Sequence, residues 1–278
     1  MNTNGNVYTI VYTTIIVVVV AAVLALAAQG LKSRQDANIK AETISQMLTA
    51  AQFATKDELS KMSNDAVLDI YADKISQAFT VNAKGEKVAD LSTERANLEL
   101  MDALKGQNSA MKKGGDLTLP VYIFDKEGTP VTVVPVYGAG LWGPVWGYVA
   151  LDKDLKTVVG AYFDHESETP GLGAKITDDP AFRAQFVGKK VDFAGEAPLS
   201  IVKGGAQGES QIDAITGATM TSKGLSAAIV TWLKAYIPYL QKVAPEGGMD
   251  CCKEGESCEG MDEGCGMDCC KDNNETTN

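Results

Sequence analysis

The sequence predicts an α+β fold, in which one amino-terminal transmembrane helix precedes a domain with an antiparallel sheet flanked by helices. Three observations predict it. Residues 7–28 are apolar and uncharged, residues 31–75 carry apolar side chains at helical spacing, and short apolar runs alternate with turns from residue 117 onward. The 278 residues are enough for one or two domains with a substantial core.

The membrane helix is predicted within residues 1–30. As a helix, residues 7–28 would be about 33 Å long at about 1.5 Å per residue, which matches the hydrocarbon core of a bilayer. Their valines and isoleucines would favour a strand in water, but a lone strand in lipid cannot satisfy its backbone. A cleaved signal peptide is the alternative. The length of the apolar run, with no basic residue before it, favours an uncleaved anchor.

Two helical segments are expected next. Residues 31–54 are predicted to form a stalk helix, because apolar residues recur there at helical spacing. Thr55 and Glu58 then have the spacing of a capping box, which predicts the start of another helix. Its apolar stripe consists of Val67, Ile70, Tyr71 and Ile75.

Residues 55–244 form the predicted domain. Its sheet is expected to contain four neighbouring strands, at residues 117–124, 131–137, 146–151 and 157–163. A shorter strand is predicted at residues 199–202. The last helix is predicted at residues 223–239, where apolar side chains line one side.

Gly138, Gly140 and Gly143 have the spacing of a dinucleotide-binding fingerprint. That motif needs a helix to begin beside the glycines, so that its amino end faces the pyrophosphate. Here Pro144 and Trp146 follow and lead into a predicted strand. We therefore expect a tight connection between strands at this point, and no NADH site on this chain.

Charge and cysteine are concentrated at the carboxyl end. Residues 246–278 hold ten acidic residues and two lysines, a net charge of −8 out of −11 for the chain, together with all six cysteines. The overall charge argues against a nucleic-acid partner. Residues 245–278 are predicted to be a disordered, acidic, cysteine-rich tail, with a soft-metal trap or a disulfide cluster as alternatives. No defined metal site is predicted.

A run of small and hydroxyl-bearing residues, Asp-Ala-Ile-Thr-Gly-Ala-Thr-Met-Thr-Ser, occupies positions 213–222 before the last predicted helix. One interpretation is that Thr221 or Ser222 caps this helix with its hydroxyl. The other is an anion site, because free amides and the positive helix end favour a phosphate group. Gly217 and Ala218 would let the backbone approach a bulky ligand.

The same run matches Asp-x-x-[Ser/Thr]-Gly-Ala-[Ser/Thr]-x-Thr, the flavinylation motif of FMN-binding subunits in bacterial respiratory complexes. Further segments resemble the family of C subunits of the sodium-translocating NADH:quinone oxidoreductase. They occur in the same order, at residues 137–143, 165–173, 187–190 and 201–206. The G subunit of the related Rnf electron-transport complex, which shares the flavin motif, is one alternative. A non-redox, membrane-tethered binding domain is another.

The resemblance implies that a separate flavin transferase joins FMN to Thr221 through a phosphoester bond. Thr219 is the rival acceptor, and Asp213 is the acidic residue that opens the motif. The other cofactor-binding residues that the resemblance implies are Thr216, Gly217 and Ala218 in the motif, Thr169, Gly171, Leu172 and Gly173 in the loop at residues 165–173, and Trp142 and Lys203. His165, the one histidine, is expected to be inert at a strand end.

The resemblance also implies a membrane complex that oxidises NADH, reduces quinone and exports sodium. Together with other membrane subunits, this chain would relay single electrons between an iron–sulfur centre and another flavin subunit, without catalytic residues of its own. The resemblance places the domain on the periplasmic side of a bacterial inner membrane. The positive-inside tendency points the other way, because the basic residues Lys32, Arg34 and Lys40 follow the span.

Overall fold

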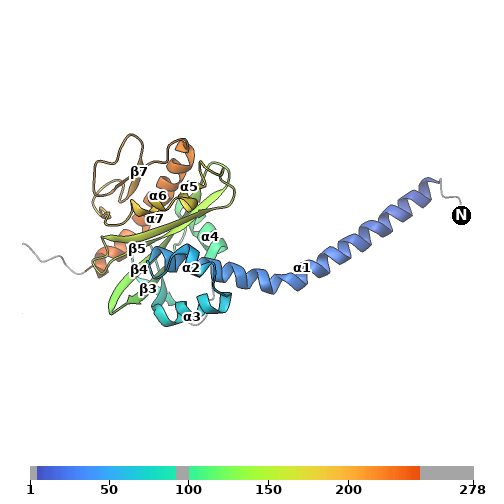
Figure 1. The fold of residues 1–278 in the computed structure, drawn as a ribbon, viewed down its shortest axis with the longest axis horizontal. Coiled ribbons are helices and arrows are strands. Elements are labelled where there is room, and N and C mark those ends of the chain that lie inside the picture. The colour runs from blue at the N-terminus through green and yellow to red at the C-terminus, as the bar shows by residue number, and fades with distance from the viewer. Residues whose placement is uncertain (1–4, 92–99, 245–278) are drawn as a thin grey trace, which may run out of the picture. The chain divides into compact units, whose positions relative to one another are not determined.

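The computed structural model describes residues 5–91 and 100–244. The predicted disordered tail at residues 245–278 lies outside the described residues. The predicted α+β fold is confirmed: a long apolar helix is followed by an antiparallel sheet with helices on both faces (Figure 1).

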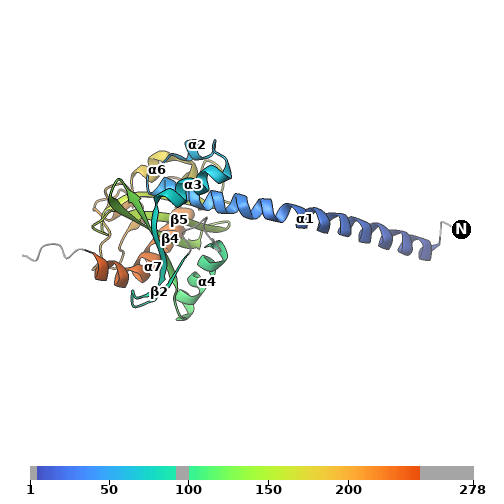
Figure 2. The same ribbon diagram turned by 90° about the horizontal axis from the view of Figure 1, so that it is seen from below.

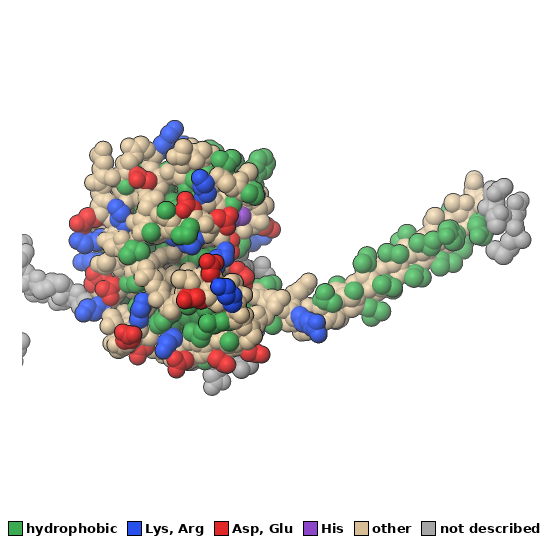
Figure 3. Space-filling model, viewed as in Figure 1, with side chains coloured by type: hydrophobic (Ala, Val, Ile, Leu, Met, Phe, Trp, Pro, Cys, Tyr) green, Lys and Arg blue, Asp and Glu red, His purple; other side chains and the backbone are tan. Residues whose placement is uncertain are grey.

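Helix α1 (Asn6–Ala50) runs without a break from the predicted membrane helix into the predicted stalk, and it ends four residues before residue 54, the predicted end of the stalk. Its first part exposes apolar side chains along its length, drawn in green in Figure 3. By length and composition, this helix can cross a membrane. Its last turns are different, because Ile44, Met47 and Leu48 are fully buried in the core of the domain.

Two short helices follow, α2 (Lys56–Leu59) and α3 (Asn64–Lys74). The predicted capping box is confirmed, since Thr55 accepts from the Glu58 amide and the Glu58 carboxylate accepts from the Thr55 amide. The predicted apolar stripe is wrong at Ile75, which begins strand β1 (Ile75–Val81) and pairs with Phe124. Strand pairing overrides the helical spacing at this position.

The main sheet has six strands in the order β2-β1-β3-β4-β5-β6, and every neighbouring pair is antiparallel. The four predicted strands correspond to β3 (Leu119–Lys126), β4 (Thr129–Ala139), β5 (Pro144–Leu151) and β6 (Val158–His165). Two strands were not predicted, β1 and β2 (Lys87–Asp90). All four residues of β2 are exposed, so this strand lacks the apolar run that identifies the others.

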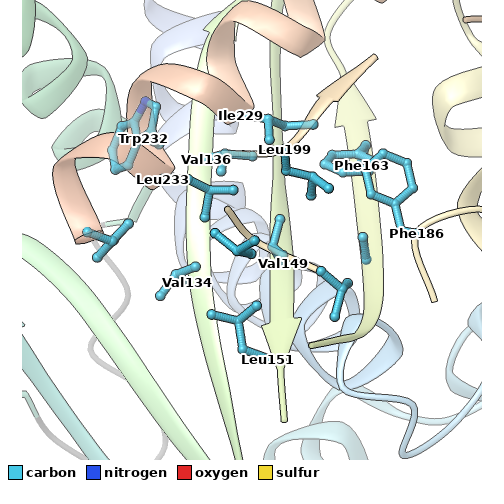
Figure 4. Close-up of a cluster of buried hydrophobic side chains, with 14 of the residues drawn as sticks. Val134, Val136, Val149, Leu151, Phe163, Phe186, Leu199, Ile229, Trp232 and Leu233 are labelled. Atoms are coloured by element: carbon cyan, nitrogen blue, oxygen red, sulfur yellow. The ribbon is translucent and has the colours of Figure 1, made fainter. Parts of the chain in front are cut away.

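Both faces of the sheet are covered (Figure 2). The end of α1 and α3 lie on one face, and α7 (Thr219–Val243) lies on the other. On β4, Val133 points to the α1 side, whereas Val134 and Val136 pack against α7 (Figure 4). Because successive side chains of a strand point to opposite faces, β4 is buried almost continuously.

Shorter elements complete the domain. Helix α4 (Leu100–Lys113) contributes Leu104 to the core on the α7 side. Helices α5 (Lys175–Asp178) and α6 (Pro180–Ala184) follow β6. The predicted strand at residues 199–202 is β7 (Ser200–Val202), which pairs in parallel with β8 (Gln211–Asp213).

Helix α7 lies unusually close to β4, because small residues meet at the contact. A Cβ atom at Gly138 would lie 2.6 Å from Ala228 Cβ. A Cβ atom at Gly224 would overlap the Ala139 carbonyl oxygen. This contact positions the amino end of α7 against the connection between β4 and β5.

Replacing Gly224 with alanine tests this contact. In an exposed helix Gly→Ala is stabilising by up to about 1 kcal/mol. Here the added methyl group has no space, so we expect Gly224→Ala to lower the free energy of unfolding by about 1–3 kcal/mol. Gly106→Ala on α4 is the matched control, because no atom lies within 4 Å of a Cβ there, and it should stabilise. Denaturant unfolding of both variants measures the difference, and a stabilising effect of both would contradict the close contact.

Candidate functional site

Helix α7 begins at Thr219, four residues before the predicted start at residue 223. Its N-cap residue is Ala218, which makes no side-chain capping hydrogen bond. The interpretation of Thr221 or Ser222 as the cap is therefore wrong. Both residues lie inside the helix, and their hydroxyls have other partners. Ser222 Oγ accepts from the Ile215 amide at 3.2 Å, and Thr221 Oγ1 donates to a residue in the loop after β6.

The Thr221 side chain is only 1% exposed, and its Oγ1 donates to Glu168 Oε2 at 2.6 Å. Glu168 lies in the segment that follows β6. This hydrogen bond joins residues that are far apart in the chain, and it is shorter than most neutral hydrogen bonds, as expected for an ionised acceptor. The hydroxyl in the flavinylation motif is therefore held by a carboxylate.

Glu168 is 5% exposed and joins three segments of the chain. Its Oε1 accepts from the Leu141 amide at 2.7 Å and from the Trp142 amide at 3.0 Å, both in the β4–β5 connection. Its own amide donates to His165 Nδ1 at 3.1 Å. His165, expected to be inert, thus orients the loop. The carboxylate connects the β4–β5 connection, the loop after β6 and the start of α7.

The charge on Glu168 is compatible with its burial. Burial acts to raise the pKa of its carboxyl, but the hydrogen bonds from the Thr221 hydroxyl and from two backbone amides outweigh this effect. The pKa of Glu168 therefore lies below its ordinary value, and the group is ionised at neutral pH. A buried carboxylate of this kind needs its donors, because an unpaired buried charge is costly.

Two glycines allow this packing. A Cβ atom at Gly140 would overlap Glu168 Oε1, and one at Gly173 would overlap Glu168 Oε2 and lie 2.7 Å from Thr221 Oγ1. The backbone of Gly173 therefore covers the hydroxyl directly. The predicted tight connection at Gly140 is also confirmed, because its amide donates to the Gly143 carbonyl at 2.7 Å between β4 and β5.

The loop after β6 turns sharply at Pro170-Gly171. The Leu172 amide donates to the Thr169 carbonyl at 3.1 Å, and Gly171 has φ of +75°, as a type II turn requires. Leu172 then lies over the flavinylation motif: a Cβ atom at Gly217 would be 3.1 Å from Leu172 Cδ2. Leu172 and Gly173 are thereby brought to the start of α7, whereas Thr169 and Gly171 form the turn that precedes them.

Exposed apolar side chains lie on the segments that enclose the covered hydroxyl. Trp142 is 67% exposed, Met220 57% and Leu172 44%, and Leu141 is also exposed. We call these four residues the apolar rim. Trp146, by contrast, is a packing residue, since its Nε1 donates to Gln46 on α1 at 3.2 Å. The apolar rim offers a surface for a flat aromatic ligand.

The remaining predicted residues lie further along the motif or on the β7–β8 pair. Asp213 ends β8 opposite Val202, and its carboxylate accepts from the Ala206 amide. Lys203 directly follows Val202 and is exposed. Thr216 and Gly217 are exposed, whereas Thr219 is half-buried. None of the contacts described joins Asp213 or Lys203 to Thr221.

These residues fit FMN. The first amides of a helix have no intrahelical acceptor, and α7 has no side-chain cap to satisfy them, so they can bind a phosphate group. The apolar rim can contact the isoalloxazine ring. Glu168 is the functional residue that sequence reasoning missed. It stands within the matched segment at residues 165–173, but its position beside Thr221 depends on contacts that spacing does not reveal.

Comparison with known proteins identifies the family. Residues 140–234 match the family model of the FMN-binding domain. The chain is 32% identical over 260 residues to the C subunit of the Na(+)-translocating NADH-quinone reductase of Vibrio campbellii, a match that covers 84% of this chain and 92% of the relative. The corresponding protein of Neisseria meningitidis serogroup B is 31% identical over 242 residues, covering 82% of this chain and 90% of the relative.

A solved structure agrees with the sequence comparisons. The crystal structure of the same reductase's C subunit from Parabacteroides distasonis matches with a TM-score of 0.63 and 33% identity, over 76% of this chain and 96% of that chain. The fold, the FMN-binding segment and the matched length all agree. The chain therefore belongs to the family of C subunits of the Na(+)-translocating NADH-quinone reductase.

Proposed function

We propose that Thr221 carries FMN through a phosphoester bond, and that this flavin is the redox group of the protein. One observation carries the proposal: the hydroxyl that ends the flavinylation motif lies in the first turn of an uncapped helix, enclosed by segments that carry the exposed side chains of the apolar rim. The helix end would bind the phosphate, and the rim would contact the ring. Thr219, the rival acceptor, lies two residues earlier and has no carboxylate partner among the contacts described.

Attachment is a phosphoryl transfer without oxidation or reduction. The Oγ1–H bond of Thr221 breaks and an Oγ1–P bond forms, while the bond between phosphorus and its leaving group breaks. A free phosphate would have to expel oxide or hydroxide, so the donor needs an activated phosphate. A flavin dinucleotide supplies one, and it releases a nucleoside monophosphate. A separate flavin transferase would bind this donor and take the hydroxyl proton.

The other predicted residues have supporting positions in this proposal. Trp142 and Leu172 are exposed beside the acceptor and would contact the faces or edge of the ring. Thr169, Gly171 and Gly173 shape the loop that holds Leu172. Thr216, Gly217 and Ala218 form the turn into α7. Asp213 and Lys203, on the β7–β8 pair, are proposed to act in attachment and in neutralising the phosphate.

The protein is proposed to work inside a membrane complex with other subunits. Its relatives are named as subunits of a Na(+)-translocating NADH-quinone reductase, and this chain has one helix that can cross a membrane. Bound FMN supplies one-electron chemistry, and the protein positions it. We propose that the chain relays electrons between an iron–sulfur centre and another flavin subunit. The match to C subunits favours this complex over the related one that contains the G subunit.

Substitution of the two candidate threonines tests the acceptor. When the chain is produced together with a flavin transferase, the denatured wild type and Thr219→Ala should fluoresce as flavoproteins on a gel. Thr221→Ala should be dark, because the atom that bonds to phosphorus is missing. Thr221→Ser is the control, since it keeps the hydroxyl and should retain at least part of the fluorescence. A fluorescent Thr221→Ala protein beside a dark Thr219→Ala protein would assign the flavin to Thr219.

The side of the membrane can be tested separately. We propose that the domain faces the periplasm, as the family resemblance implies. The opposing signal is modest, because it consists of only three basic residues, Lys32, Arg34 and Lys40. Protease added to intact spheroplasts should therefore degrade the domain while a cytoplasmic marker protein survives. A domain as fully protected as the marker would place it in the cytoplasm.

A further inference from the structure

We propose that Glu168 covers the acceptor hydroxyl in the unmodified protein, and that the hydrogen bond between Glu168 and Thr221 must break when the flavin is attached. The inference rests on the proposed attachment to Thr221. Glu168 is then a positioning residue: its hydrogen bond holds the segment at residues 166–173 over Thr221 until phosphoryl transfer occurs. Its hydrogen bond to Thr221 and the phosphoester bond exclude each other.

The covered state follows from the packing. Thr221 is 1% exposed, and the hydroxyl is enclosed by the Glu168 carboxylate and by the backbone of Gly173. A phosphorus atom bonded to Oγ1 needs the space that these groups occupy. The loop must therefore move away from the start of α7 before the hydroxyl can be modified.

The chemistry of the product gives a second reason. Thr221 Oγ1 donates its only proton to Glu168 Oε2. A phosphoester oxygen has no proton, so this donor is lost after attachment. The phosphoester also carries a negative charge, which would lie within a few ångströms of an ionised carboxylate. Like charges at such a distance repel, and the repulsion is strong in a partly buried site.

Replacing Glu168 with glutamine distinguishes the effect of its hydrogen bond to Thr221 from the effect of its packing. In the wild type Oε1 accepts from two backbone amides, and Oε2 accepts from the hydroxyl. A glutamine side chain has the same shape but one acceptor and one donor group. If its oxygen keeps the two backbone amides, its NH₂ group faces Thr221 and can only donate to Oγ1. Glu168→Gln therefore replaces the charge-assisted hydrogen bond from the hydroxyl with a neutral one of opposite direction, and it also removes the charge that would repel the phosphate.

The test compares the melting temperatures of full-length protein in detergent, produced without and with the flavin transferase. In the unmodified form, Glu168→Gln should lower the melting temperature by about 2–4 °C, because a charge-assisted hydrogen bond is lost. In the modified form it should cause no loss, or a rise, because the wild-type carboxylate there has lost its Thr221 donor and faces the negative charge of the phosphoester. Glu166→Gln, in the same loop and exposed, is the matched control and should change neither form.

An equal loss in both forms would overturn the proposal, since a purely structural Glu168 predicts the same cost with and without flavin. No loss in the unmodified form would overturn it as well. If Glu168→Gln does not fold, amide hydrogen exchange of the wild-type protein tests the proposal instead. The amides of residues 166–173 should exchange faster in the modified protein than in the unmodified one. Equal or slower exchange would contradict the proposal. Failure of the attachment itself is recognised independently, because the intact mass would then show no flavin.

Discussion

One buried carboxylate, Glu168, holds the candidate site together. It accepts hydrogen bonds from the Leu141 and Trp142 amides and from the Thr221 hydroxyl, so three distant segments of the chain meet at two oxygen atoms. Without it, two backbone amides in partly buried hydrogen bonds and one buried hydroxyl would lose their acceptor, which costs more than the loss of exposed hydrogen bonds would. The glycines at 140 and 173 follow from the same constraint, because no larger residue leaves space for the carboxylate.

The rest of the domain fixes where these segments can meet. Small residues let α7 lie directly on β4, and this places the first turn of the helix at the end of that strand. On the opposite face, Gln46 near the end of α1 donates to Asp164 at 2.8 Å and accepts from Trp146. Asp164 immediately precedes His165, whose Nδ1 accepts a hydrogen bond from the Glu168 amide. The membrane helix is thus part of the core that supports the site.

Sequence patterns predicted the parts of this architecture that depend on local order. The short apolar runs of β3 to β6, the capping box at Thr55 and the long apolar run of α1 are local features, and the elements they predict are present. Strand β2 was missed because all four of its residues are exposed, and the start of α7 was predicted four residues late because the helix has no side-chain cap to mark it. The motif predicted Thr221 as the acceptor, whereas the position of Glu168 beside it is known only from the structure.

The central claim is that Thr221 is esterified to FMN. Mass spectrometry of the tryptic peptide that ends at Lys223 tests it most directly, with protein isolated from cells that contain the flavin transferase and then denatured. We expect a mass increase equal to FMN minus water, with fragment ions that assign it to Thr221. An unmodified peptide from such cells, or a flavin located on Thr219 or Thr216, would contradict the claim.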